Sequence, residues 1–127
     1  MRPLLMLLSL VTLPAFAEER SGAAVYESTC SECHGTGKLN APLFANKHAW
    51  GKLVREGLDD LVPAALGGVR KMPAKGGNAT LSDLEVARGV VYMANAGGGK
   101  FADPSAEDAA RWRAKADKKK RKAAKTG

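Results

Sequence analysis

The chain has 127 residues, two cysteines and a formal net charge of +7. This length suits one domain with appendages, and no segment after residue 17 is apolar enough for a membrane helix. The positive charge lies at one end. Residues 18–99 hold nine basic and nine acidic residues, whereas residues 100–127 hold ten basic and four acidic ones. The basic balance therefore describes the carboxyl-terminal segment and not the expected core.

Residues 1–17 have the pattern of a secretory signal peptide. Arg2 supplies a positive start, residues 4–13 are almost wholly apolar, and residues 15–17 read Ala-Phe-Ala, a small-x-small cleavage site. An uncleaved membrane anchor is the alternative, but this apolar run is too short to span a bilayer as a helix. We therefore expect cleavage after Ala17 and export to the bacterial periplasm.

Two helices are predicted in the first part of the mature chain. The first covers residues 21–33, with Ser21 as its N-cap. The second covers residues 53–66, and we expect it to be broken around Gly57 and Pro63.

A third helix carries the clearest signals. Ser82 can cap it, Glu85 completes a capping box, and the glycines at 97–99 end it. Helical spacing relates its apolar residues Leu84, Ala87, Val90, Val91 and Ala94. Residues 35–50 and 67–79 are rich in Gly, Asn and Pro and are predicted to be loops. No strand shows convincing alternation, so the fold class is all-α.

The carboxyl-terminal segment, residues 100–127, is predicted to lie outside the domain formed by residues 18–99. Ser105 and Asp108 could begin a further helix, but Trp112 is the only large apolar residue that follows. We therefore expect a frayed or solvated helix, or a flexible extension, and not a core element.

The motif that carries chemistry is Cys30-Ser31-Glu32-Cys33-His34, which matches the C-x-x-C-H signature of covalent haem attachment. Cysteines three residues apart lie on one face of a helix, so each can form a thioether with one haem vinyl group. His34 then supplies a proximal ligand to the iron. The sequence thus predicts one haem c.

Three other interpretations of these cysteines are weaker. A thioredoxin-like dithiol requires a βαβ pattern, which this chain lacks. Zinc usually requires four ligands, and only Cys30, Cys33, His34 and His48 could serve. A single disulfide in a secreted chain is the third alternative.

The second axial ligand could be Met72, Met93 or His48. Met72 is favoured because it lies in a loop where Pro73 stiffens the chain and glycines permit close approach. Met93 is expected to be a core residue of the third helix, and His48 a surface or hydrogen-bonding residue. A His/Met pair raises the reduction potential and leaves no open position on the iron.

The chain resembles the class I cytochromes c, and among them the small bacterial cytochromes of the c-five type. The resemblance covers residues 22–96. Besides residues 30–34, it rests on Asn40-Ala41-Pro42, Trp50 before Arg55-Glu56-Gly57, Ala65-Leu66-Gly67-Gly68 before Met72-Pro73-Ala74-Lys75-Gly76, and Tyr92-Met93. It implies three main helices around one covalently bound haem.

The resemblance also implies roles for single residues. The carbonyl of Pro42 would accept a hydrogen bond from Nδ1 of His34 and so orient the imidazole. Trp50 would line the haem, for which ordinary core packing is the plainer alternative. Gly22 and Tyr26 of the first predicted helix would pack across the third predicted helix near Tyr92. Some relatives carry an extra cysteine pair after the methionine loop, and residues 78–83 contain no cysteine here.

The function implied is one-electron transfer in the periplasm by a carrier that is not itself an enzyme, with an oxidase, a reductase or another cytochrome as partner. The alternatives are a haem-based sensor, a peroxidase or disulfide oxidoreductase, and an electron-donating subunit of a larger redox complex. The basic segment could dock an acidic partner or an anionic membrane surface, or have no partner. Export makes nucleic acid an unexpected partner.

Overall fold

The computed structural model describes Val11 and residues 18–127, and this part of the chain is helical with no strand. The predicted signal peptide lies outside the described residues, apart from Val11. The all-α prediction is confirmed. The helical elements are α1 (Gly22–Val25), η1 (Tyr26–Cys30), α2 (Ser31–His34), η2 (Lys38–Asn40), α3 (Lys47–Glu56), α4 (Leu58–Gly67), η3 (Ala74–Gly77), α5 (Asp83–Ala96) and α6 (Ala106–Thr126).

The first predicted helix is present as one continuous segment made of α1, η1 and α2. It begins where predicted, because the hydroxyl of Ser21 accepts a hydrogen bond of 3.2 Å from the Ala24 amide. Its middle, η1, is a π-helical turn in which the Ser31 amide donates to the Tyr26 carbonyl. Such turns occur mostly as single insertions in α-helices, often at functional sites.

The second predicted helix is two helices. The expected break at Gly57 is confirmed, since this residue has a φ of 85° between α3 and α4. The expected break at Pro63 is wrong, because Pro63 lies inside α4 and is fully buried there. Its buried ring offsets the one backbone hydrogen bond that proline removes. The predicted loop over 35–50 ends earlier than expected, because Asn46 caps α3 by accepting from the Ala49 amide at 3.0 Å.

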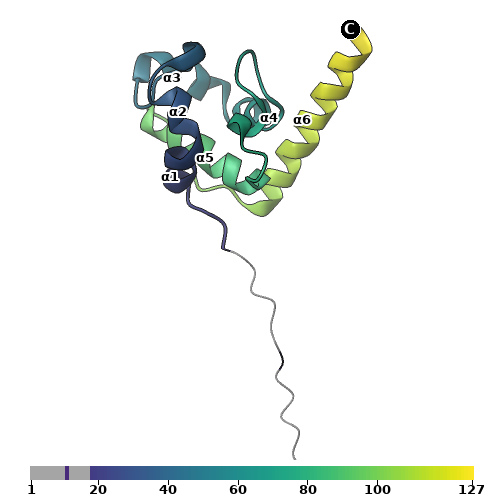
Figure 1. The fold of residues 1–127 in the computed structure, drawn as a ribbon, viewed down its shortest axis with the longest axis horizontal. Helices are drawn as coiled ribbons and strands as arrows, with labels where there is room; N and C mark the ends of the chain where they lie inside the picture. The colour runs from purple at the N-terminus through teal and green to yellow at the C-terminus, as the bar shows by residue number, and fades with distance from the viewer. Residues whose placement is uncertain (1–10, 12–17) are drawn as a thin grey trace, which may run out of the picture.

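The third predicted helix, α5, is confirmed together with its capping box between Ser82 and Glu85. It forms the centre of the molecule, with α1, α4 and α6 packed against it (Figure 1). The crossing of α1 is very close, because a Cβ on Gly22 would lie 2.4 Å from the Arg88 carbonyl oxygen. The rings of Tyr26 and Tyr92 meet beside it with centroids 5.6 Å apart. This is the crossing that the resemblance implied.

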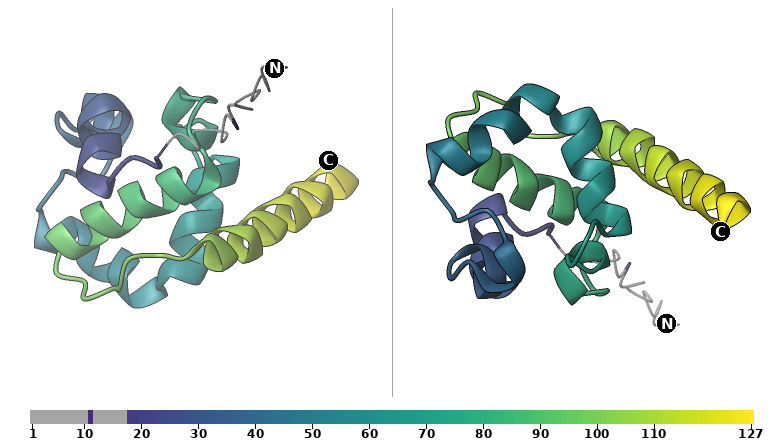
Figure 2. Two further views of the ribbon diagram at one scale, coloured as in Figure 1. Left: turned by 90° about the horizontal axis from the view of Figure 1, so that it is seen from below. Right: turned by 90° about the horizontal axis from the view of Figure 1, so that it is seen from above.

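The carboxyl-terminal helix α6 corrects the sequence analysis. Its predicted start at Ser105 and Asp108 is confirmed by a complete capping box. The expectation that it contributes nothing to the core is wrong for its first half, where Ala109, Trp112 and Ala116 are buried. Trp112 and Ala116 belong to the core cluster that α6 shares with α4 and α5. Residues 118–127 are all exposed, and the end of α6 projects away from the other helices in every view (Figures 1 and 2).

The buried apolar side chains form two clusters. One joins α1, α4, α5 and α6 around residues such as Leu66 and Trp112, and the other surrounds Trp50 and Met93. Cys30 and Leu61 contact both clusters and are themselves only partly buried. The first cysteine of the haem motif therefore lies at the seam of the core.

Candidate haem site

The attachment motif spans the junction of η1 and α2. Cys30 ends the π-helical turn, and Cys33 and His34 close the following α-helical turn. Both cysteines are free thiols and partly buried, so the disulfide alternative is not what the structure contains. The imidazole of His34 is buried, with 8% of the residue exposed. The motif thus presents two thiols and one imidazole from a single helical segment.

His34 is oriented by the chain that follows it. Its Nδ1 lies 2.9 Å from the carbonyl oxygen of Pro42. Because a carbonyl only accepts hydrogen bonds, Nδ1 carries the proton and Nε2 keeps its lone pair for a metal. The Phe44 amide also donates to the His34 carbonyl at 2.7 Å. The contact that the resemblance implied for Pro42 is therefore present.

Trp50 lies beside His34. Its indole N–H donates to the Leu43 carbonyl at 2.9 Å, and its ring centroid is 5.9 Å from that of His34. The residue is 4% exposed, and Gly97 packs so closely that a Cβ there would lie 2.3 Å from the Trp50 Cβ. Trp50 is thus a rigid core residue next to the expected ligand, and its role toward haem stays a prediction.

Met72 lies in the loop that follows α4. Two backbone hydrogen bonds between Val69 and Met72, of 3.0 and 2.9 Å, close a tight turn. Lys75, Gly76 and Gly77 then all have positive φ, which sharply reverses the chain. The partly buried side chain of Met72 packs against the same core cluster as Cys30 and Leu61. The loop therefore places Met72 on one of the two core clusters that Cys30 contacts.

The rival ligands behave as expected. Met93 is a core residue of α5 that is only 2% exposed, and His48 is exposed on α3. Within the described residues, no three His, Cys, Asp or Glu side chains gather to hold a metal ion. The four zinc-ligand candidates therefore do not form a site.

The environment of Cys30 also disfavours a redox-active dithiol. Burial raises the pKa of the Cys30 thiol to about 11, so this sulfur is protonated at neutral pH. Cysteines of disulfide oxidoreductases instead have a lowered pKa that supplies the thiolate. A neutral thiol against apolar side chains fits an attachment point better than a nucleophile.

The donor set and its surroundings fit a haem. Two thiols three residues apart and an imidazole with one free nitrogen are the groups that covalent haem c uses. Leu61 is a partly buried apolar side chain that, like Cys30, packs against both core clusters, and the partly buried Leu58 and Met72 pack against one of them. Leu39, Leu43 and Val69 are large apolar residues that the polypeptide leaves exposed. Cys30 and Cys33 would hold the haem, and His34 and Met72 stay the predicted axial ligands.

Comparison with known proteins agrees with this site. The family model described as cytochrome c oxidase, cbb3-type, subunit III, matches residues 17–93. Cytochrome c-555 of Chlorobaculum tepidum is 40% identical over 89 residues, covering 66% of this chain and 82% of that protein. Cytochrome c5 of Azotobacter vinelandii is 41% identical over 76 residues, covering 58% of this chain and 92% of that protein.

A solved structure of an electron-transfer complex of nitrite reductase with cytochrome c contains a similar chain. The identity is 36% and the TM-score 0.57, with 60% of this chain and 93% of that chain covered. The chain belongs to the class I c-type cytochromes. It is a monohaem electron-transfer cytochrome and not an enzyme, and its haem c is attached through Cys30 and Cys33.

The structure adds residues to this cytochrome that the sequence analysis missed. Trp112 of α6 donates to Asp59 of α4 at 2.7 Å, and Arg113 forms a two-point ion pair with Asp83 at the start of α5. The signal was available in the spacing of residues 109, 112 and 116, which places three apolar side chains on one helix face. The surrounding lysines and arginines obscured it.

Proposed function

We propose that this cytochrome carries single electrons in the periplasm with His34 and Met72 as axial ligands. The observation that carries the proposal is the hydrogen bond between His34 Nδ1 and the Pro42 carbonyl. It holds the imidazole in the tautomer that leaves Nε2 for iron. The placement of Met72 on the same core cluster as Cys30 supports the second ligand.

The protein's own contribution is to hold and orient the side chains that would bind the iron and to exclude water from the interior. The bound haem supplies the Fe(III)/Fe(II) couple. Pro42 fixes the imidazole of His34, the Val69–Met72 turn restrains the thioether, and the buried side chains of Trp50 and Leu66 keep water from the interior. With His34 and Met72 on the iron, the neutral thioether would favour Fe(II) and no coordination position would be left for a substrate. This arrangement suits electron exchange and not bond chemistry.

The partner is another redox protein, such as an oxidase, a reductase or a second cytochrome. The solved complex of nitrite reductase with a similar cytochrome supports this class. Residues 118–127 offer a separate contact, because they carry six basic and no acidic side chains. All ten are exposed on the projecting end of α6, which suits an acidic partner or an anionic membrane surface.

The periplasm follows from the signal peptide pattern of residues 1–17. No helix in the described part of the chain is long and apolar enough to cross a membrane. Cytochrome c5 of Azotobacter vinelandii, which is 41% identical, supports the same class of carrier.

The test is the visible spectrum of the mature protein made in a host with c-type haem maturation. The ferric wild type should show the weak far-red band of methionine ligation, and the ferrous form should not bind carbon monoxide. Met72→Ala should lose the band and bind carbon monoxide, whereas Met93→Leu, a matched change in the core, should do neither.

Other outcomes point to other functions. Ready binding of carbon monoxide by the wild type would move the function toward a sensor or a peroxidase. Loss of the far-red band in Met93→Leu but not in Met72→Ala would refute the ligand assignment. Isolation of the native protein only with an oxidase or reductase would favour the alternative, an electron-donating subunit of a larger redox complex.

A further inference from the structure

We propose that α6 positions the Met72 loop through a chain of charges formed by Arg113, Asp83 and Lys75. The inference rests on the proposed ligation by Met72. It concerns a helix that follows the residues matched by the family model, which end at 93. Arg113 and Asp83 would thus be positioning residues for an axial ligand that they do not touch.

The chain of charges begins three residues after the methionine. The ammonium of Lys75 donates to the Leu81 carbonyl at 2.6 Å and lies 3.2 Å from Asp83 Oδ1. Its side chain is 20% exposed, so the contact is shielded from much of the solvent. This lysine also has a φ of 55°, a left-handed conformation that a non-glycine residue adopts at an energetic cost. The two contacts of Nζ help to retain it.

Asp83 links the lysine to α6. Nη2 of Arg113 donates to Asp83 Oδ1 at 2.7 Å and Nε donates to Oδ2 at 2.9 Å. Two parallel hydrogen bonds between a guanidinium and a carboxylate give geometric specificity as well as energy. The hydrogen bond from Arg113 lowers the pKa of Asp83, so the carboxylate, which also contacts Lys75, keeps its charge to a lower pH than an ordinary aspartate.

The remaining restraints on the loop do not reach α6. The Val69–Met72 turn is local, and Asn78 Nδ2 donates to Thr29 Oγ1 of the first helix at 3.1 Å. Asp83 is thus the point where the loop after Met72 is joined to α6. The buried Trp112 and Ala116 flank Arg113 in sequence and fix its helix against α4.

The expected consequence is tighter retention of the methionine ligand. A loop held at both of its ends opens less often, so an external ligand gains access to the iron less often. Loss of the Arg113 guanidinium should weaken the hold of Asp83 on Lys75 without removing any residue of the loop. The Met72 thioether should then be displaced faster, although the resting spectrum stays that of methionine ligation.

The test is the displacement of methionine by imidazole in the ferric holoprotein, followed as loss of the far-red band. Arg113→Ala should raise the limiting rate by about threefold to tenfold, the range expected for a partly buried, two-point ion pair. The limiting rate of Arg113→Lys should lie between those of the wild type and Arg113→Ala. The control is Lys115→Ala, which removes one charge from the same helix. Lys115 pairs with Asp60 at 3.3 Å, away from the loop.

Thermal unfolding of each variant separates positioning from general stability. The proposal is supported if Arg113→Ala accelerates displacement and Lys115→Ala does not at comparable melting temperatures, and if Lys75→Gln adds little to Arg113→Ala. It is overturned if Arg113→Ala and Lys75→Gln both displace methionine at the wild-type rate. A wild type without the far-red band would instead refute the ligation by Met72, and the positioning role with it.

Discussion

The indole N–H of Trp112 donates to the carboxylate of Asp59 at 2.7 Å, which joins α6 to the first turn of α4. Trp112 is 3% exposed, and its cluster also includes Leu66 of α4 and Val86 of α5. The same helix α4 carries Leu61, which, like Cys30, packs against both core clusters. The carboxyl-terminal helix therefore supports the helix that borders the haem site.

We predict that Trp112→Ala lowers the free energy of unfolding of the holoprotein by about 3–5 kcal/mol, as for other buried aromatic truncations. Trp112→Phe keeps most of the apolar contact and loses the bond to Asp59, so it should lower it by only about 1–2 kcal/mol. Denaturant titration of both variants makes the comparison. A loss below about 1 kcal/mol for Trp112→Ala would show that α6 is not part of the folded core.

Much of this structure could be predicted from local signals. Ser21, Ser82 with Glu85, and Ser105 with Asp108 all cap helices where the sequence placed them. These motifs are reliable because a hydroxyl or carboxylate satisfies amides only a few residues away. The spacing of Cys30, Cys33 and His34 is equally local, which is why the haem could be predicted before the fold.

The errors arose where tertiary contacts decide the outcome. Pro63 continues a helix because the core buries its ring, and nothing near it in sequence announces that burial. The first half of α6 packs because three residues, at 109, 112 and 116, form a narrow stripe within a basic segment. Composition describes the whole segment and hides the stripe. The link from Arg113 to Lys75 spans three elements and could not be predicted from spacing.

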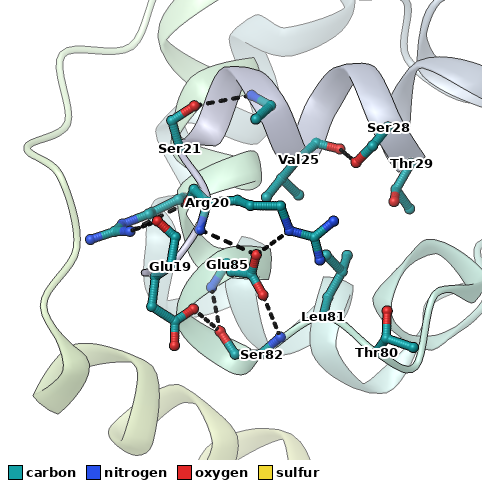
Figure 3. A network of polar contacts seen from close by, with 12 residues as sticks. Glu19, Arg20, Ser21, Val25, Ser28, Thr29, Thr80, Leu81, Ser82 and Glu85 are labelled. Atoms are coloured by element: carbon teal, nitrogen blue, oxygen red, sulfur yellow. Dashed lines mark hydrogen bonds and ion pairs between the residues drawn. The ribbon is translucent and has the colours of Figure 1, made fainter. Parts of the chain in front are cut away.

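The ion pair between Arg20 and Glu85 predicts an acid-sensitive part of the stability. Glu85 is buried at the start of α5, where it accepts from the Arg20 side chain and from the Ser82 amide (Figure 3). The hydrogen bond from Arg20 lowers the pKa of Glu85. Because the folded protein holds this carboxylate ionised, its stabilisation is present above the ordinary glutamate pKa of about 4.3 and is lost as the pH falls below it.

Glu85→Gln should therefore destabilise the protein by about 1 kcal/mol at pH 7, a value reduced by the partial exposure of Arg20. Gln keeps the capping contact to the Ser82 amide, so the variant isolates the charge. The difference from the wild type should shrink as the pH is lowered from about 5 toward 3. Denaturant titrations across this range provide the measurement, and a difference that does not change with pH would contradict the assignment.

The same substitution, glycine to alanine, is predicted to have opposite effects on stability at the crossing of α1 and α5 and inside α3. A Cβ on Gly22 would lie 2.4 Å from the Arg88 carbonyl oxygen, which is backbone and cannot move aside. Gly22→Ala should lower the free energy of unfolding by about 1–3 kcal/mol, as overpacking does. Gly51 lies inside α3, where a Cβ would meet only the end of the Arg55 side chain at 3.5 Å. Gly51→Ala should raise it by about 0.5–1 kcal/mol.

Thermal or chemical unfolding of the two glycine variants, side by side, makes this test. The haem spectrum should be unchanged in Gly51→Ala, because a Cβ there meets only the end of the Arg55 side chain. A stabilising effect of Gly22→Ala would mean that the two helices do not approach as closely as the structure describes.

The exposed end of α6 predicts a charge-dependent association that depends on position and not only on net charge. Lys118→Gln/Lys120→Gln/Lys122→Gln removes three charges from the projecting segment, and Lys47→Gln/Lys52→Gln/Arg55→Gln removes three from exposed residues of α3. Binding to vesicles of phosphatidylglycerol and phosphatidylcholine should fall on the order of 100-fold for the first variant, at about 1 kcal/mol per basic residue. Added salt should weaken wild-type binding and reduce the difference in vesicle affinity between the wild type and the first variant. Equal losses in both variants would show that net charge alone governs association, and α6 would then have no docking role.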